Sequence, residues 1–188
     1  MTIPVRLHRS ELCVPGTNVR MLEKASGLGA DVVMLDLEDA VAPDDKPQAR
    51  LNVITALEEL DWTGCCVSVR INGLDTGMTD ADLEAVVPGR PDAIVFPKAE
   101  GAPSVVHLDA KLTAREALAG LPEGQIKILA QAVETAAGLF AAGTFRGASA
   151  RLIGLTWGPE DLSSELGATA NRDPQGELTE PYRLARSV

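Results

Sequence analysis

Short apolar segments recur along this chain at intervals of roughly 30 residues, the length of one strand-plus-helix unit. They are near-continuously apolar, which is typical of strands in a parallel sheet covered on both faces and disfavours an antiparallel sandwich. Six such strands are predicted, at 12–15, 32–37, 65–71, 93–97, 126–133 and 152–157.

Amphipathic stretches lie between these segments and predict helices. The helices are expected at 18–28, capped by Thr17, and at 46–60, 81–87, 105–118, 135–145 and 161–166, before a polar loop over 167–180. Alternating strands and helices place the chain in the α/β class. A doubly wound sheet and a (β/α)8 barrel both remain open, because periodicity does not separate them.

Composition excludes several classes of protein. The formal net charge is −10 and aromatic residues make up 3% of the chain, which argues against nucleic-acid binding. No run is long enough to span a membrane, and residues 1–9 lack the apolar core of a signal peptide. The three cysteines lie in apolar segments without metal-ligand spacing, so we expect buried, reduced thiols and a cytoplasmic protein.

Most of the predicted strands end in polar residues. In a parallel βα fold these ends meet on one face, where ligands bind. The first turn, at 14–18, fits neither a dinucleotide-binding loop nor a P-loop. The polar residues expected to converge are Asp36, Glu38, Asp39, Arg70, Lys98, Glu134 and Asp161.

Two of these carboxylates suggest a metal site. Glu134 and Asp161 lie about one βα unit apart, which places them on adjacent strand ends. Two neighbouring carboxylates repel, and hard oxygen ligands without a nearby histidine favour Mg2+ or Mn2+. Arg70 could hold a substrate carboxylate with its guanidinium fork, so the pattern predicts a site for an anionic oxo acid. Taken singly, each carboxylate could instead be a helix cap or first-turn residue.

The same motifs, in order, resemble the citrate lyase β-subunit (CitE-like) proteins of the HpcH/HpaI aldolase superfamily, which also includes malyl-CoA and citramalyl-CoA lyases. The resemblance covers roughly residues 9–185. Its motifs are Val14-Pro15-Gly16, Asp36-Leu37-Glu38-Asp39-Ala40-Val41 followed by Lys46 and Ala49-Arg50, Val69-Arg70-Ile71-Asn72, Phe96-Pro97-Lys98-Ala99-Glu100, Val133-Glu134-Thr135-Ala136-Ala137-Gly138 and Trp157-Gly158-Pro159-Glu160-Asp161-Leu162.

The resemblance implies a (β/α)8 barrel, of which about six βα units are present. Residues 1–188 would form a single domain lacking strands 7 and 8, supplied by further sequence or by a partner. It also implies a homotrimer or homohexamer. The implied activity is Mg2+-dependent cleavage or formation of a 3-hydroxyacyl thioester such as citryl-, malyl- or citramalyl-CoA, yielding an acyl thioester and a 2-oxo acid.

The resemblance also assigns roles to residues. It places the metal on Glu134 and Asp161 and the oxo-acid carboxylate on Arg70, with these three as the catalytic set. The remaining implied residues are Gly158, Pro159 and Glu160 at the substrate, Asp36, Glu38, Asp39 and Lys98 around the metal and its waters, and Arg20 and Lys24 near the CoA or acyl-carrier arm. The acid/base residue is expected beyond residue 188 or from a neighbouring subunit.

Two other functions remain open. One is a class II aldolase acting on free 4-hydroxy-2-oxo acids. The other is a non-catalytic, metal-binding subunit of a larger lyase complex.

Overall fold

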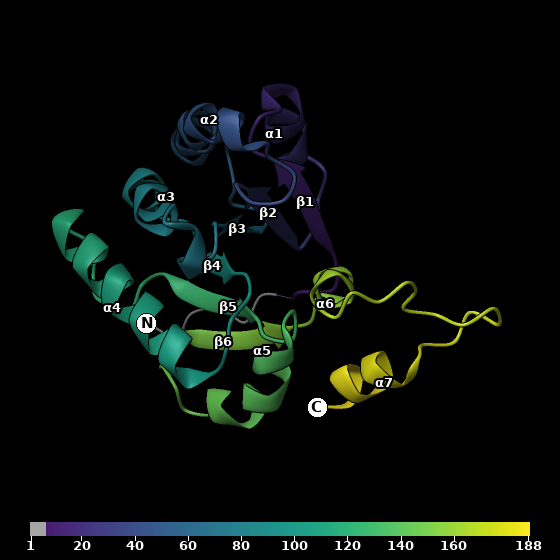
Figure 1. Cartoon of the computed structure of the whole chain (residues 1–188). Helices are drawn as coiled ribbons and strands as arrows, with labels where there is room; N and C mark the ends of the chain where they lie inside the picture. Colours follow the sequence, from purple (N-terminus) through teal and green to yellow (C-terminus); the bar gives the residue numbers. More distant parts are fainter. Residues whose placement is uncertain (1–6) are drawn as a thin grey trace.

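A computed structural model describes residues 7–188, which contain a six-stranded parallel sheet (Figure 1). All six predicted strands are confirmed. They are β1 (Glu11–Pro15), β2 (Val32–Asp36), β3 (Cys66–Arg70), β4 (Ala93–Phe96), β5 (Lys127–Gln131) and β6 (Leu152–Thr156).

The order of the strands decides between the two architectures. Each strand pairs with its neighbours in sequence, from β1 through β6, whereas a doubly wound sheet reverses its order at a switch point. The sheet is also curved. This follows from a cavity of about 270 Å³ that is lined by residues of both edge strands, including Cys13 on β1 and Thr156 on β6. The predicted partial (β/α)8 barrel is confirmed.

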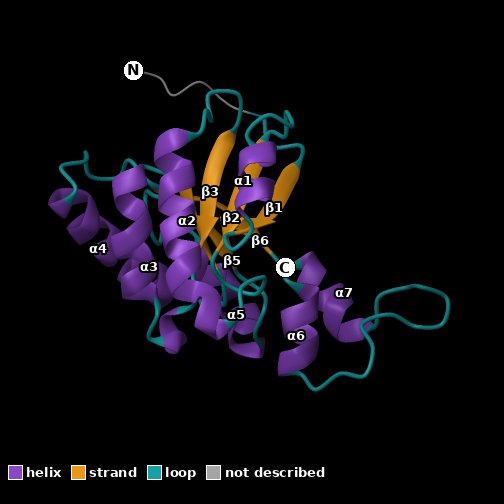
Figure 2. Cartoon of the chain, turned by 90° about the horizontal axis from the view of Figure 1, so that it is seen from above, coloured by secondary structure: helices purple, strands orange, loops and turns teal. Residues whose placement is uncertain are grey.

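Helices follow the strands, and α1 to α4 pack one after another outside the sheet (Figure 2). The helices are α1 (Val19–Ala25), α2 (Lys46–Glu59), α3 (Thr79–Val86), α4 (Ala102–Leu118), α5 (Ala136–Ala141), α6 (Pro159–Glu165) and α7 (Glu180–Ser187), with 3-10 turns η1 (Pro43–Asp45), η2 (Leu74–Thr76), η3 (Val87–Gly89) and η4 (Ala142–Phe145).

Three details differ from the sequence predictions. Asn18, not Thr17, caps α1, because its side-chain oxygen accepts the N–H of Met21 at 3.2 Å. The helix predicted over 135–145 is divided into α5 and the turn η4. Helix α7 was not predicted, although Tyr182 within it is fully buried.

Apolar side chains of the strands and helices form the core. Leu35, Val69 and Ile94 have no exposed surface, and α2 adds Ala49 and Val53 to the same cluster. This burial is the main force holding the helices against the sheet.

Gly16 permits close packing at the end of β1. Its N–H donates to the carbonyl oxygen of Asp36 at 2.8 Å. A Cβ atom at this position would lie 2.9 Å from that oxygen and from Cγ2 of Val53. Only glycine lets the β1 turn approach β2 and α2 this closely.

The expectation of buried cysteines is correct for Cys65 and Cys66 but wrong for Cys13. Cys13 is exposed because β1 is an edge strand and this residue lines the open cavity of about 270 Å³ between the two edge strands. None of the helices within residues 7–188 has the length and apolar character that crossing a membrane requires. The expectations of one domain over 1–188 and of no signal peptide fall partly on residues 1–6, outside the described part, and stay predictions.

Candidate active site

Charged side chains meet in a cavity of about 660 Å³ at the carboxyl ends of the strands. Three of the residues predicted from the strand ends, Lys98, Glu134 and Asp161, line it together. Its other lining residues are Leu74, Asp75, Phe96, Glu100, Ser104, Thr135, Ser164 and Glu165.

Glu134 is held firmly in this cavity. Its Oε2 accepts the backbone N–H of Lys98 at 2.7 Å, and its Oε1 accepts Nε2 of Gln131 at 2.6 Å. Burial, together with the nearby carboxylates of Asp161 and Glu38, raises the pKa of Glu134 to about 7, and the hydrogen bond from the backbone N–H of Lys98 opposes this rise. The Glu134 carboxyl group is therefore buried and oriented, and a cation bound next to it would stabilise its ionised form.

Gly158 makes room for this carboxylate. A Cβ atom at residue 158 would overlap Oε1 of Glu134 and lie 2.8 Å from its Cγ. The glycine directly precedes α6, whose first turn carries Asp161. The loop after β6 thus brings Asp161 towards Glu134 without covering it.

Arg70 and Asp36 form a two-point ion pair beside the cavity. They are paired residues at the ends of β3 and β2, with Nε to Oδ1 at 2.8 Å and Nη2 to Oδ2 at 2.6 Å. Burial raises the pKa of Asp36, but hydrogen bonds and charge from Arg70 outweigh it and lower the pKa below its ordinary value. Asp36 is thereby fixed as an anion, whereas Nη1 of Arg70 makes only longer contacts, 3.4 Å to Oε2 of Glu38 and 3.5 Å to Oδ2 of Asp39.

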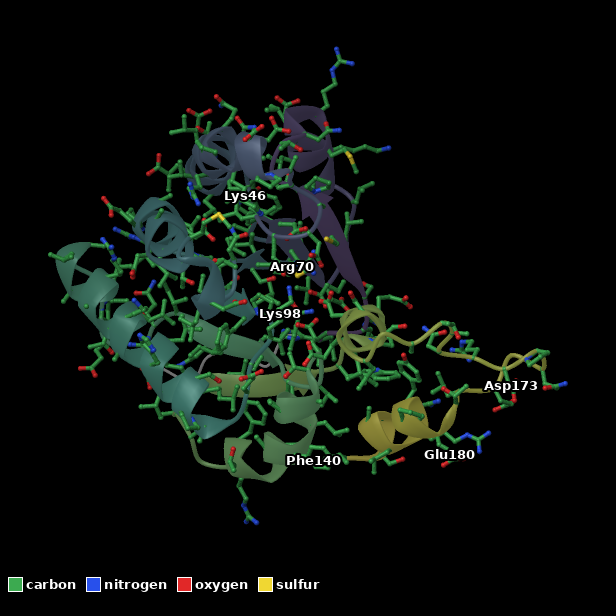
Figure 3. The ribbon with its side chains drawn as sticks, in the orientation of Figure 1. Lys46, Arg70, Lys98, Phe140, Asp173 and Glu180 are labelled. Atoms are coloured by element: carbon green, nitrogen blue, oxygen red, sulfur yellow. The ribbon has the colours of Figure 1, made fainter. Side chains whose placement is uncertain are left out.

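Glu38 connects Arg70 with Lys98, two residues that Figure 3 labels next to each other. Its Oε1 accepts Nζ of Lys98 at 3.1 Å, while its buried Oε2 lies 3.4 Å from Nη1 of Arg70 without a hydrogen-bond partner. Burial and then the charge of Asp39 raise the pKa of Glu38. Asp39 itself is exposed, with Oδ2 at 3.5 Å from Arg70 Nη1.

Of the remaining predicted residues, Gly158 alone lies against Glu134. Gly158 and Pro159 are half-buried at the start of α6, and Glu160 is exposed and accepts a hydrogen bond from Asn171 at 3.1 Å. Arg20 and Lys24 are exposed on α1 and are not among the residues lining the cavity.

Sequence reasoning missed the role of Gln131. This side chain, at the last position of β5, holds Glu134 three residues further along the chain. The sequence does mark the position of Gln131, since it is the first polar residue after an apolar run. Its hydrogen bond to Glu134 could not be predicted, because that contact depends on the directions of both side chains.

A cation in this cavity would rely on few protein ligands. Residues 7–188 contain no group of three or more His, Cys, Asp or Glu placed to hold a metal ion. Glu134 and Asp161 form a two-carboxylate set, and Mg2+ is commonly bound through one or two carboxylates together with water and substrate oxygens.

The chain is similar in sequence to one protein family and to individual members of it. The family model described as HpcH/HpaI aldolase/citrate lyase matches residues 9–183. The chain is 42% identical over 168 residues to an L-malyl-CoA/β-methylmalyl-CoA lyase of Rhodobacter capsulatus, covering 87% of this chain and 52% of that protein. It is also 42% identical over 166 residues to a (3S)-malyl-CoA thioesterase of Cereibacter sphaeroides, covering 88% and 53%.

A solved structure is similar in fold and sequence. It is a citrate lyase β subunit from Mycobacterium tuberculosis complexed with oxaloacetate and magnesium, with a TM-score of 0.75 and 32% identity. The match covers 97% of this chain and 74% of that chain. By contrast, the chain spans about half the length of the two curated relatives.

Proposed function

Because the chain belongs to the HpcH/HpaI aldolase/citrate lyase family, we propose that it carries the metal and oxo-acid site of a Mg2+-dependent carbon–carbon lyase. The substrate is a 3-hydroxyacyl-CoA thioester of the malyl, citramalyl or citryl type, cleaved to an acyl thioester and a 2-oxo acid. The observation that carries this proposal is the pairing of Glu134 and Asp161 in one cavity near the Arg70 guanidinium.

The local chemistry fits Mg2+. Glu134 and Asp161 offer hard oxygen ligands whose mutual repulsion a divalent cation would relieve. Gly158 leaves space at Glu134, and Glu38 presents a buried oxygen without a hydrogen-bond partner. When bound, Mg2+ would act as a Lewis acid on the substrate's hydroxyl or keto oxygen.

The protein's own residues orient the acid fragment. Asp36 occupies Nε and Nη2 of Arg70, and Nη1 has only the longer contacts to Glu38 and Asp39, at 3.4 and 3.5 Å. The substrate carboxylate would therefore bind on the Nη1 side and replace these longer contacts. Lys98 holds Glu38 next to this position. Such fixed charges favour the transition state because they need no rearrangement as charge moves on to the departing groups.

The same proposal includes an assembly and a location. We place the enzyme in the cytoplasm as a homotrimer or homohexamer, with the acid/base residue coming from beyond residue 188 or from a neighbouring subunit. An exposed apolar side chain supports an assembly: Phe140 on α5 is 85% exposed. Light scattering coupled to size-exclusion chromatography tests the subunit number.

Isothermal titration tests the site directly. Oxaloacetate should bind in the presence of Mg2+ and not in EDTA, and Glu134→Ala should abolish this dependence. Glu177→Ala, which removes an exposed carboxylate on the 171–179 hairpin, serves as the charge-matched control. Absence of binding, or binding that survives Glu134→Ala unchanged, contradicts the proposal.

Product analysis separates lyase from related activities. With malyl-CoA, cleavage yields glyoxylate and acetyl-CoA, whereas hydrolysis yields malate and a free CoA thiol. Release of free thiol without glyoxylate would favour a thioesterase, the activity of one relative. Turnover of free 4-hydroxy-2-oxo acids would favour the aldolase alternative, and oxo-acid binding without any turnover would favour a non-catalytic subunit.

A further inference from the structure

Lys46, the first residue of α2, is a buried cation that the proposed chemistry does not use. The residue is 6% exposed, and no carboxylate within residues 7–188 forms an ion pair with it. Its Nζ donates instead to the carbonyl oxygens of Leu37 at 2.8 Å and Glu38 at 3.0 Å. One ammonium therefore holds two successive carbonyls of the loop that follows β2.

A second group holds the same loop from the side of β3. Nδ2 of Asn72 donates to the carbonyl of Leu37 at 3.0 Å and to Oδ2 of Asp82 at 2.7 Å. Oδ1 of the fully buried Asp82 accepts Nε of Arg50, one helical turn after Lys46 on α2. The loop is thus fixed through a buried polar network anchored on α2 and α3.

This loop determines the direction of Asp36. The backbone N–H groups of Glu38 and Ala40 donate to Oδ1 and Oδ2 of Asp36 at 2.9 and 3.0 Å. The same two oxygens bind Arg70. A change in the path of the loop would therefore turn Asp36 and, with it, the guanidinium.

We propose that Lys46 is a positioning residue for the substrate carboxylate, acting through the 37–40 loop and Asp36 on Arg70. This inference rests on the proposed function for the identity of the ligand. Figure 3 shows Lys46, Arg70 and Lys98 in this order from α2 towards the cavity. Removal of Lys46 leaves the carbonyl of Glu38 with only the backbone N–H of Val41, at 3.1 Å, and that weaker hold on the loop is transmitted to the guanidinium.

The metal half of the site has two anchors of its own. Glu134 is fixed by Gln131 and by the backbone N–H of Lys98, and neither group contacts Lys46. The 37–40 loop reaches Lys98 at its side chain, where Oε1 of Glu38 accepts Nζ at 3.1 Å, and not at the N–H that holds Glu134. Loss of Lys46 should consequently affect the oxo acid more than Mg2+. A residue with a purely structural role would not separate the two ligands.

Titration calorimetry on Lys46→Met makes this separation measurable. With Mg2+ saturating, the Kd for oxaloacetate should rise about tenfold or more, the usual range for loss of a group supporting a ligand-binding residue. The Kd for Mg2+ alone should stay within about twofold. Lys46→Arg, which keeps a charged donor, should recover part of the oxaloacetate affinity.

Trp62→Phe is the matched control. It removes a side-chain hydrogen bond to the carbonyl of Ala56, 2.9 Å long, near the far end of α2 from the loop. It should lower the melting temperature without changing the Kd for oxaloacetate. If Lys46→Met does not fold, Asn72→Ala takes its place, because it removes the other donor to Leu37, and the same selective loss is expected.

Hydrogen exchange measured by NMR tests the position of the Arg70 guanidinium in the absence of any ligand. The Nε–H resonance of Arg70, assigned by its loss in Arg70→Lys, should exchange with solvent about tenfold faster in Lys46→Met and at the wild-type rate in Trp62→Phe. Unchanged exchange together with unchanged oxaloacetate affinity, or equal weakening of Mg2+ and oxaloacetate binding, overturns the inference. If wild-type protein fails to bind oxaloacetate, the proposed function fails while the exchange rate still decides the role of Lys46.

Discussion

The backbone N–H of Lys98 reaches Oε2 of Glu134 from a left-handed backbone conformation, with a hydrogen bond of 2.7 Å and a φ of 51° at Lys98. Within residues 7–188, Arg90 is the only other residue besides glycine with positive φ. The unusual conformation turns the N–H of Lys98 towards the buried carboxylate while its ammonium extends to Glu38. Backbone strain of this kind is often found at functional sites.

Two substitutions at Lys98 should therefore separate backbone strain from charge. Both Lys98→Ala and Lys98→Gly remove the ammonium, but only alanine carries the Cβ atom that disfavours positive φ. We expect the alanine variant to be less stable than the glycine variant by about 1 kcal/mol. Urea unfolding of the pair measures this difference, and equal stability would contradict the assigned conformation.

Mg2+ binding should depend on pH through Glu134. Because the pKa of this carboxyl is raised to about 7, a proton competes with the cation below that pH. The Kd for Mg2+ should weaken by up to about tenfold for each pH unit below 7 and level off above it. Calorimetric titrations between pH 5.5 and 8.5 are a direct check, and a flat profile would count against Glu134 as a ligand.

The same pKa predicts the sign of a stability change in metal-free protein. Between the ordinary value of 4.5 and about 7, the folded state holds a proton on Glu134 that the unfolded chain has released. The contribution of Glu134 to the free energy of unfolding should be fully present below pH 4.5 and decline as pH rises to 7. Glu134→Gln should remove this decline in denaturant titrations, and an unchanged slope would refute it.

Loss of the charged groups should reduce catalysis strongly. Arg70→Ala, Glu134→Ala and Asp161→Ala should each lower kcat/KM for thioester cleavage on the order of 10²-fold or more. Arg70→Lys should recover only a small part, because an ammonium does not reproduce the two-point contact with Asp36. Arg186→Ala, a substitution at an exposed residue of α7, is the control and should leave steady-state rates unaltered. A comparable loss in this variant would show that the assay detects damage to the whole protein and not loss of a site residue.

Gly158→Ala should damage metal binding specifically. The added methyl group would overlap Oε1 of Glu134, so the carboxylate must turn away from its present position. We expect Mg2+ affinity to fall at least about tenfold, the scale on which groups that orient a metal ligand act. Gly143→Ala, where no atom lies within 4 Å of the new methyl group, is the control and should bind Mg2+ normally.

The strands and the convergence of polar residues at their ends could be predicted because both follow from local pattern. An apolar run such as 126–133 locates its strand, which the structure places at Lys127–Gln131, and a parallel sheet brings successive strand ends to one face. Lys98, Glu134 and Asp161 accordingly share the cavity. Helix α7 escaped prediction, since its buried face consists of few side chains among polar neighbours.

The connections between polar residues could not be predicted. The sequence suggested Arg70 as a fork for a substrate, whereas the structure shows that Asp36 already occupies one side of it. Lys46 and Asn72 stand in the motifs of the resemblance, but their contacts could not be predicted, because they donate to backbone carbonyls, which are present at every residue. These roles depend on side-chain direction, which three-dimensional packing determines.

Pairing of each strand with its neighbour in sequence also orders the assembly of the protein. During synthesis, every new βα unit meets a sheet edge that has already been made, so no long loop must close before the next strand can pair. The Asp36 and Arg70 pair comes together with β2 and β3, and Glu134 and Asp161 follow with β5 and β6. The anion-binding half of the site therefore rests on strands that are synthesised before those of the cation-binding half.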